Sequence, residues 1–339
     1  MKESVYINSS DADVTFKSNT SPDEDRKILN ALNRIFTRFP LTQDWYEWFT
    51  YRSPSGRCIW FFGEDKKDVI STYGYLPIEV LMCGKLWEGV LAVNMGLIPS
   101  YWAKGTYQQF SRFSFEEIFC KFNKKLIMAV PNNIGYMAHV RLGWIELGQL
   151  KFVNLSKDKI VQIVDHNPTE QVQEVDFNDL PLRLNEFIKE TAQRYELFVM
   201  KDMDWLKWRY SRPDYKDSYR FGVLELNEDI AGYIIMKVYR DVEQNTKKLH
   251  IMDINYKGGR PSLEKLIAFA GRMLSAEGAD TLDTGVCLTS TLYDDFLKIG
   301  FEETDTERHL MIYTRDEQLK SLVQEIKDIH FTLGDNDIY

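Results

Sequence analysis

The sequence predicts a mixed α/β fold in which two copies of one domain follow each other along the chain. At 339 residues the chain exceeds what one hydrophobic core usually supports, so two domains are expected. The first half has the order helix, β-meander and then α-β-α-β, which is typical of a mixed sheet covered by helices. Two segments also recur: DWYEWFTYRSP from Asp44 returns as DWLKWRYSRP from Asp204, and HVRLGW ending at Trp144 is echoed by FLKIGF ending at Phe301. Matches in the same order at nearly equal offsets indicate a tandem duplication.

Composition points to a globular protein that binds small ligands. Hydrophobic residues make up 44% and aromatic residues 14% of the chain, which excludes disorder as a description of the whole. The formal net charge is −9 and no long basic run occurs, so binding to a nucleic-acid backbone is not expected. The four cysteines are scattered without metal-ligand spacing, and we expect them to be reduced and mostly buried, with no metal site.

The hydropathy pattern places the protein in the cytoplasm. The N-terminal stretch is polar and has no apolar signal region, so secretion is not expected. No segment approaches the roughly 18 consecutive apolar residues of a membrane span. We therefore expect a soluble, cytoplasmic protein.

The first helix is predicted over residues 21–39. It opens with Ser-Pro-Asp-Glu-Asp, which supplies an N-cap, a proline in the first turn and acidic residues near the helix N-terminus, and apolar residues follow at helical spacing. DWYEWFTY is read as a second helix. Three strand-like runs come next, at residues 58–62, 69–75 and 78–82, and Cys83-Gly84-Lys85 is read as a hairpin turn.

The remaining elements of the first half alternate between strand and helix. A strand is predicted over 90–98, a helix over 105–122, a short strand over 126–130 and a helix up to Leu142. Trp144 then opens another strand.

Residues 166–182 are predicted to be the linker between the domains, because the surrounding segment DHNPTEQVQEVDFNDLPL is polar and carries two prolines. This gives a first domain at 1–165 and a second at 183–339. Residues 316–331 carry apolar side chains at helical spacing, which predicts a terminal helix. Its apolar face must pack on its own chain or on a second subunit, so a homodimer stays open.

The segment Pro99 to Phe110, PSYWAKGTYQQF, has the form of a pyrophosphate-binding loop. Holding a pyrophosphate requires converging backbone N–H groups where a helix begins, and a glycine where a side chain would block close approach. The segment resembles the P-x-Y-R-G-K-G-I loop of the GNAT superfamily of N-acyltransferases, with matches at Pro99, Tyr101, Lys104 and Gly105. Trp102 stands where the family usually has arginine or glutamine, and Ala103 where it usually has glycine.

A second GNAT signature, N-x-x-A-x-x-x-Y-x-x-x-G-F, is similar to the segment from Asn132 to Trp144. The resemblance covers about residues 27–155. It implies acyl-CoA as co-substrate, with His139 and Asn132 as catalytic residues. His139 takes the place of the tyrosine that usually protonates the leaving thiolate. Coenzyme contacts are implied at Leu97, Ile98, Trp102, Ala103, Lys104, Gly105, Thr106 and Tyr107.

The general base stays open. Asn94 cannot act as one, while Glu47, Glu79, Glu88 and an ordered water chain are all candidates. The second half follows the family less closely, since Thr289 and Phe296 stand at the asparagine and tyrosine positions, and a phenylalanine cannot transfer a proton. We therefore expect a degenerate second GNAT-like domain that shapes the acceptor site. Asp204, Trp205 and Asp253 are its candidate acceptor contacts.

The overall pattern is similar to tandem GNAT enzymes that acylate a nucleotide-linked amino sugar, such as a dTDP-3-amino-3,6-dideoxyhexose, for bacterial surface polysaccharides, including lipopolysaccharide O-antigen. The acyl group implied is acetyl or a short hydroxyacyl such as 3-hydroxybutanoyl. An aromatic-rich second domain suits a pyrimidine base and a sugar ring. Three alternatives remain: transfer to a peptide or protein amine, aminoacyl transfer from tRNA, which the negative charge disfavours, and a GNAT-like binding protein without catalysis.

Overall fold

The computed structural model describes residues 5–6, 14–19, 21–37, 40–66, 68–102, 105–166, 171–215, 218–241 and 246–336. Contacts divide the chain into two compact units. The first unit comprises residues 1–79, 87–145 and 311–321, and the second comprises 80–86, 146–310 and 322–339. Residues 146–165, expected in the first domain, therefore belong to the second unit. The segment 166–182 includes a paired strand, so it is more than a linker.

The first unit begins with two strands and two helices. Its elements in order are β1 (Val5–Tyr6), β2 (Val14–Ser18), α1 (Pro22–Ile35), α2 (Gln43–Tyr51), β3 (Ile59–Asp65), β4 (Asp68–Met82), β5 (Lys85–Leu97), the 3₁₀ turn η1 (Pro99–Tyr101), α3 (Thr106–Cys120), β6 (Leu126–Ala129) and α4 (Asn133–Arg141). Ser21 caps α1 in a reciprocal capping box with Glu24, and the proline stands in the first turn as predicted.

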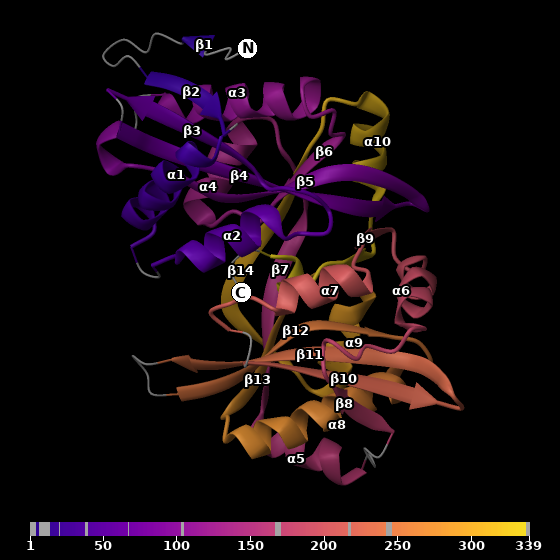
Figure 1. Cartoon of the computed structure of the whole chain (residues 1–339). Helices are drawn as coiled ribbons and strands as arrows, with labels where there is room; N and C mark the ends of the chain where they lie inside the picture. Colours follow the sequence, from indigo (N-terminus) through magenta and orange to yellow (C-terminus); the bar gives the residue numbers. More distant parts are fainter. Residues whose placement is uncertain are drawn as a thin grey trace. The chain divides into compact units, whose positions relative to one another are not determined.

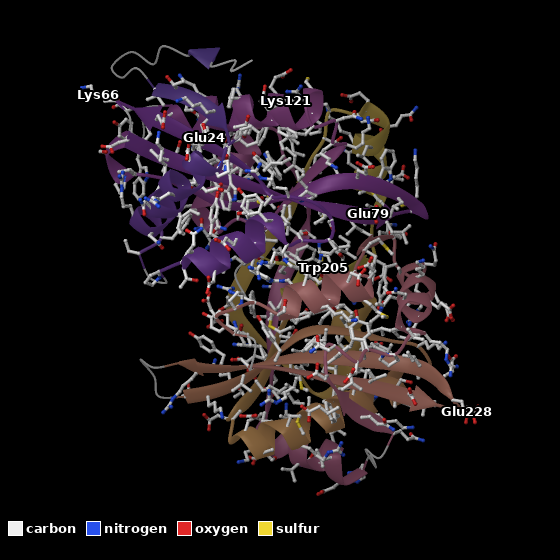
Figure 2. The ribbon with its side chains drawn as sticks, viewed as in Figure 1. Glu24, Lys66, Glu79, Lys121, Trp205 and Glu228 are labelled. Atoms are coloured by element: carbon white, nitrogen blue, oxygen red, sulfur yellow. The ribbon has the colours of Figure 1, made fainter. Side chains whose placement is uncertain are left out.

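The remaining elements lie mostly in the second unit, and residues 311–321 belong to the first. These elements are β7 (Ile145–Ser156), α5 (Lys157–His166), β8 (Val172–Val175), α6 (Leu184–Ala192), β9 (Leu197–Val199), α7 (Met203–Tyr210), β10 (Tyr219–Leu226), β11 (Asp229–Asp241), β12 (Thr246–Tyr256), α8 (Arg260–Glu277), β13 (Thr281–Cys287), α9 (Thr291–Ile299), β14 (Glu302–Tyr313), α10 (Glu317–Glu325), β15 (Ile329–His330) and the 3₁₀ turn η3 (Leu333–Asp335). The run β3-β4-β5-α3-β6-α4 corresponds to β10-β11-β12-α8-β13-α9 (Figure 1). Figure 2 labels Lys66 and Glu228, which lie at the tips of the equivalent hairpins β3–β4 and β10–β11.

The final strands of the two copies are exchanged. In each copy a parallel pair forms around a crossover helix, β5 with β6 and β12 with β13. The strand that follows β6 in sequence, β7, pairs antiparallel with β13 in the second unit. The last strand of the second copy, β14, pairs through Met311–Tyr313 with Ile127–Ala129 of β6 in the first unit. Each unit is thus completed by a strand from the other half of the sequence.

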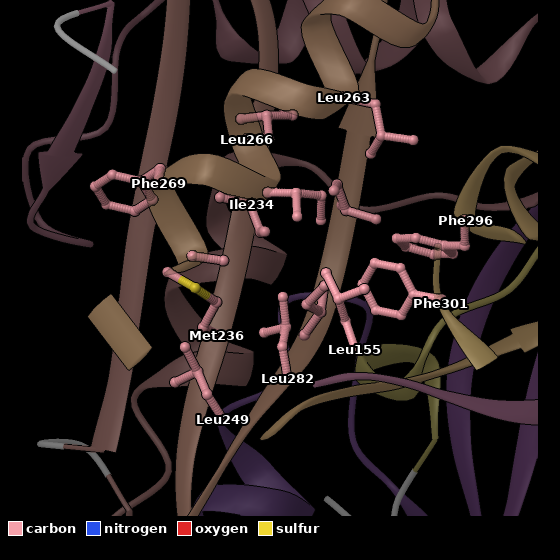
Figure 3. Packing of buried hydrophobic residues seen from close by; sticks show 14 of the residues in the cluster. Leu155, Ile234, Met236, Leu249, Leu263, Leu266, Phe269, Leu282, Phe296 and Phe301 are labelled. Atoms are coloured by element: carbon pink, nitrogen blue, oxygen red, sulfur yellow. The ribbon is translucent and has the colours of Figure 1, made fainter. Parts of the chain in front are cut away.

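In both units, successive side chains along a strand point to opposite faces of the sheet, and both faces are covered. In the first unit, Trp60 contacts Tyr46 and Phe49 of α2, while its neighbour Phe61 packs on Phe113 of α3. In the second unit the core shown in Figure 3 joins strands β11 to β13 to α8 and α9. The repeated tryptophans are core residues: Trp45, Trp48, Trp205 and Trp208 are all buried.

Several expected elements differ from the structure. The two strands expected at 69–75 and 78–82 are one strand, β4. Its pairing with β3 ends at Tyr75, and pairing with β9 begins at Val80, so Pro77 lies where no ladder donor is required. The hairpin turn is confirmed, with Cys83 and Gly84 at φ of 47° and 76°.

The terminal helix is shorter than expected. It ends at Glu325, and Ile329 lies in β15 beside Leu197. Leu319 and Val323 are buried within the chain, so covering this face does not require a second subunit. The cysteines also differ from expectation: all four are free, but only Cys58 and Cys287 are buried, while Cys83 and Cys120 are exposed.

Candidate active site

The loop between β5 and α3 presents an open helix N-terminus. Gly105 is the N-cap of α3 with a left-handed φ of 74°, a conformation that favours glycine. No side chain caps this end, and the first turn carries no acidic residue. The N–H groups of Thr106 and its successors are therefore turned toward the site of an incoming anion, which the helix dipole also favours. Ala103 and Lys104, expected in the same loop, lie outside the described residues.

Trp102 has a definable structural role in this loop. Its side chain is 61% exposed, and its indole Nε1 donates a hydrogen bond of 2.8 Å to the carbonyl oxygen of Leu97. Through this hydrogen bond Trp102 links the loop to the end of β5. It contributes shape and a planar ring, and no charge.

At the end of β5, one of the two backbone N–H groups that were expected to bind the coenzyme already has a partner. The Ile98 N–H donates to the carbonyl of Ile70 at 2.9 Å, so it is not free to bind a pantetheine or thioester group. This corrects the expectation for Ile98. An irregularity lies further back on the strand: Asn94 has a φ of 48°, and its carbonyl accepts from the Thr72 hydroxyl. The equivalent irregularity in β12 lies beside Met252, where the register with β11 shifts.

His139 lies on α4 in a buried polar cluster. Its Nδ1 is 2.7 Å from the carbonyl oxygen of Gly135, which can only accept, so the ring carries its proton on Nδ1. The Tyr107 hydroxyl of α3 lies 3.3 Å from the same nitrogen. On the other side, Nε2 is 3.5 Å from the Tyr73 hydroxyl and presents a lone pair toward it. The Trp144 ring packs edge-on at 4.6 Å.

The cluster continues as a chain of hydroxyl groups into the core. Tyr73 and Tyr75 share strand β4 with ring centroids 4.5 Å apart, and their hydroxyls are hydrogen-bonded. The Tyr75 hydroxyl is 2.7 Å from that of Ser114 on α3. Ser114 donates in turn to the Ser111 carbonyl. Three elements of the first unit thus place one connected set of groups that can pass a proton.

Burial sets the protonation states in this cluster. It lowers the pKa of His139, against the smaller opposing effect of the Gly135 carbonyl, so the imidazole is neutral near pH 7. Burial raises the pKa of Tyr107 to about 12. Tyr107 therefore keeps its proton near neutrality, as do Tyr73 and Tyr75, whose pKa values burial also raises. The acid role expected of His139 stays a prediction, which the pH dependence of turnover can test.

Asn132 has a capping role. Its side-chain oxygen accepts from the Gly135 N–H at 2.8 Å and forms the N-cap of α4. It acts on the site through the position of α4, which carries His139. The expectation that Asn132 is catalytic has no support from this geometry.

The candidate acceptor contacts of the second unit are not brought together as expected. Asp253 is fully buried, with an ion pair of 3.0 Å to Lys201 and a hydrogen bond from Tyr233, so it has no surface for an acceptor. Trp205 is also buried, with its ring 6.0 Å from that of Trp208 (Figure 2). Asp204 is exposed in the first turn of α7 and stays available.

None of the glutamates considered as a general base belongs to the His139 cluster described above. Glu88 is exposed and paired with Lys124 at 3.0 Å, and Glu47 accepts from Gln43. Glu79 is exposed (Figure 2).

Sequence reasoning missed Tyr73 and Tyr75 entirely. Their segment, STYGYLPIEV, carries the signal of a strand and no signal of a site. Tyr107 was expected to contact the coenzyme, and its proximity to His139, 32 residues away, came only from the fold.

The described part of the chain contains no group of three or more histidine, cysteine, aspartate or glutamate side chains placed to hold a metal ion. None of its helices combines the length and the apolar character needed to cross a bilayer.

Solved structures resemble this chain over most of its length. A GCN5-related N-acetyltransferase from Anabaena variabilis superposes with a TM-score of 0.70 at 14% identity, covering 89% of this chain and 73% of that one. A yeast N-myristoyltransferase (Saccharomyces cerevisiae) with bound myristoyl-CoA superposes with a TM-score of 0.62 at 12% identity, covering 92% and 84%. The chain has the tandem GNAT fold.

A third similar structure, a probable N-acyltransferase from Enterococcus faecalis, has a TM-score of 0.67 at 12% identity, covering 88% of this chain and 72% of that one. No family model and no curated protein matches the sequence. At these identities the likeness establishes the fold, and the activity has to be argued from the residues.

Proposed function

We propose that the protein is an acyl-CoA-dependent N-acyltransferase whose coenzyme site lies in the first unit. The observation that carries the proposal is the uncapped N-terminus of α3 behind Gly105, with Tyr107 of its first turn in contact with His139. This joins an anion-binding helix end to a group that holds a transferable proton. The similar structures named above include an N-acetyltransferase and an N-myristoyltransferase with bound myristoyl-CoA, which supports this class.

In the proposed reaction a neutral amine attacks the thioester carbonyl carbon directly. The C–N bond forms, the C–S bond breaks, and the coenzyme leaves as a thiolate that takes up a proton. The surplus proton of the amine passes through water to the group that protonated the thiolate, so that no net proton is released. The N–H groups of the first turn of α3 bind the pyrophosphate and fix the position of the coenzyme.

Tyr107 is the proposed proton donor to the thiolate. Its hydroxyl carries a proton across the neutral range because burial raises its pKa to about 12. His139 is a positioning residue: its Nδ1–H points to the Gly135 carbonyl and to the Tyr107 oxygen, and a hydrogen bond from it stabilises a phenolate. A proton released by the amine then restores the tyrosine.

The proposed acceptor is the amine of a nucleotide-linked amino sugar, with an acetyl or short hydroxyacyl donor, in surface polysaccharide biosynthesis. The support is the sequence pattern that resembles such enzymes, together with a second domain that lacks the His139 equivalent, since Phe296 occupies that position. This domain would shape the acceptor site, and Asp204 is its exposed candidate contact.

The test measures thiol release from acetyl-CoA, 3-hydroxybutanoyl-CoA and myristoyl-CoA with three acceptor classes: dTDP-linked amino sugars, peptides with a free N-terminus, and no acceptor. Acceptor-dependent release only with the amino sugars supports the full proposal. Release only with peptides overturns the acceptor and retains the enzyme class. Isothermal titration with acetyl-CoA is the prior step, since absence of binding for every acyl-CoA would overturn the enzyme proposal.

A further inference from the structure

A buried lysine without a carboxylate partner lies in the second unit. Lys237 of β11 is only 5% exposed, and no carboxylate of the described residues contributes to its electrostatics, which are dominated by burial and by Arg212 and Arg209. Its nearest interaction is with the Tyr215 ring, whose centroid is 3.8 Å from Nζ. Burial of an uncompensated ammonium group is costly, and proteins normally pair such a group.

A second cation lies against the same ring. The Arg212 guanidinium is 4.6 Å from the Tyr215 centroid, and Arg212 is 9% exposed. Its Nε has no hydrogen-bond partner, and its carboxylate neighbour Asp214 is 3.8 Å away, beyond hydrogen-bond distance. The Tyr219 hydroxyl, whose residue pairs with Lys237 across the β10–β11 ladder, is also buried without a partner. Among the described residues, two donors, Arg212 Nε and the Tyr219 hydroxyl, thus lack a hydrogen-bond partner close to the Lys237 ammonium.

The charge balance of this cluster is positive. Burial and the charges of Arg212 and Arg209 together lower the pKa of Lys237 to about 7. Arg209 itself donates to the carbonyls of Gly334 and Asn336, which carry no full charge. Asp214 is the carboxylate near Arg212 in the described part of the chain. Among the described residues that act on Lys237 and Arg212, the cationic side chains therefore outnumber the carboxylates.

We propose that Lys237, Arg212 and Tyr219 form a binding site for a phosphate group of a small molecule. The guanidinium offers a planar pair of donors, the ammonium offers a point charge, and the phenol offers a neutral donor, which together match a tetrahedral oxyanion. The excess of positive charge favours a phosphate or diphosphate over a singly charged carboxylate. Because the Tyr215 ring covers both cations, entry of the ligand requires this ring to turn aside.

The site is separate from the residues of the proposed coenzyme site, all of which belong to the first unit. The inference stands without the proposed function, since binding is measured in the absence of acyl-CoA. A free phosphate and the diphosphate of a nucleotide-linked ligand share this chemistry, and the test distinguishes them.

The experiment is isothermal titration of the full chain with inorganic phosphate, inorganic pyrophosphate, dTDP and acetate at constant ionic strength. Lys237→Met removes the charge and keeps the apolar stem, and Arg212→Gln removes the second cation. Lys189→Met, which changes an exposed lysine of α6 in the same unit, is the matched control. We expect pyrophosphate or dTDP to bind, and each site variant to lose about tenfold in affinity, while the control stays within about twofold.

Thermal unfolding keeps the proposal testable if a variant folds poorly. Because Lys237→Met removes an uncompensated buried charge, the ligand-free variant should melt at or above the temperature of the wild type and no longer respond to pyrophosphate. Tighter binding of dTDP than of pyrophosphate assigns the site to a nucleotide ligand, and the reverse assigns it to a free phosphate compound. Binding of acetate in preference to both, equal affinities in wild type and Lys237→Met, or no binding of any probe would overturn the proposal.

Discussion

At the residue scale, comparing Gly105 with Gly84 distinguishes an effect on stability from an effect on coenzyme binding. Gly105 and Gly84 have nearly the same φ, 74° and 76°, and neither is crowded by other atoms at the position of an added Cβ. Alanine at either position should lower the free energy of unfolding by about 1 kcal/mol, because the left-handed region disfavours a Cβ.

Only Gly105→Ala should also weaken acetyl-CoA binding, since only this position precedes the open N-terminus of α3. Denaturant unfolding and titration with acetyl-CoA on both variants make the comparison. Equal coenzyme affinity in the two variants would separate this loop from the coenzyme site.

Tyr107 and His139 can be told apart as proton donors by the pH dependence of kcat. A lowered pKa leaves His139 without its extra proton above about pH 6.5, so an imidazolium acid would lose activity as the pH rises through that range. Tyr107, with its pKa raised to about 12, keeps its proton up to pH 10. We expect kcat not to fall between pH 6 and 9.

The matching substitution is Tyr107→Phe, which keeps the ring and removes the proton. It should reduce kcat about a hundredfold with little change in the KM for acyl-CoA. A wild-type kcat that declines with a midpoint below pH 6.5, or a Tyr107→Phe enzyme with full turnover, would return the acid role to His139.

The protonation of Lys237 gives a third prediction at this scale. With a pKa of about 7, the ammonium is mostly charged at pH 6 and mostly neutral at pH 8. Burial lowers the pKa of His250 to about 4 and raises that of Tyr219, so neither group changes its charge in this interval. Sulfate, whose own charge is constant, should therefore bind about tenfold more weakly at pH 8 than at pH 6. Calorimetric titration checks this, and Lys237→Met should show a flat profile.

At the element scale, a buried ionic cluster joins the C-terminal segment to β9 and β12 of the second unit. Lys201, which follows β9, pairs at 3.0 Å with both Asp253 of β12 and Asp335 of η3, and all three are fully or almost fully buried. The Thr332 hydroxyl also donates to Asp253, and the Thr332 backbone N–H donates to Asp335. Each carboxylate therefore has both an ion pair with Lys201 and a hydrogen bond from Thr332.

Removing the lysine should be costly, because it leaves two carboxylates buried together. We expect Lys201→Met to lower the free energy of unfolding by about 3–5 kcal/mol. The control is Lys320→Met, which breaks the exposed pair with Glu317 and should cost at most about 1 kcal/mol. Urea unfolding of both variants measures the difference, and equal losses would show that the buried cluster adds no more than a surface pair.

The elements that the sequence predicted well are those with local signals. The N-cap and proline of α1, the Cys83-Gly84 turn and the start of α3 are each encoded within a few residues, and all are observed. The single strand β4 was missed because Pro77 is a local breaker, and only the change of partner from β3 to β9 makes it harmless.

The candidate site also contains features that the sequence predicted from local signals and features that it did not. The loop at Gly105 and the position of His139 followed from motifs in the sequence. The contact of Tyr107 with His139 and the hydroxyl chain through Tyr73 depend on which strand faces which helix, and no local pattern carries that information. Lys237 reads in the sequence as an ordinary polar position of a strand, and only its burial distinguishes it.

At the scale of the whole molecule, the exchange of β7 and β14 makes each half of the sequence dependent on the other. Strand β6 is buried along its whole length, and one of its ladders is formed by Met311–Tyr313 from the far end of the chain. In the other unit, β13 is paired over seven positions with β7. Because the two copies exchange their last strands, they are no longer independent domains.

The fragment 1–165 should therefore not fold by itself into a soluble monomer. Without Met311–Tyr313, the backbone groups of Ile127–Ala129 lose their partners along an apolar edge, which favours aggregation. Joining residues 302–325 to this fragment through a Gly/Ser linker restores the missing ladder and should raise the yield of soluble monomer. A matched fusion with Met311 and Ile312 changed to aspartate supplies the length without the strand. Size-exclusion chromatography and the cooperativity of thermal unfolding make the comparison, and a monomeric, cooperatively unfolding 1–165 would contradict the dependence.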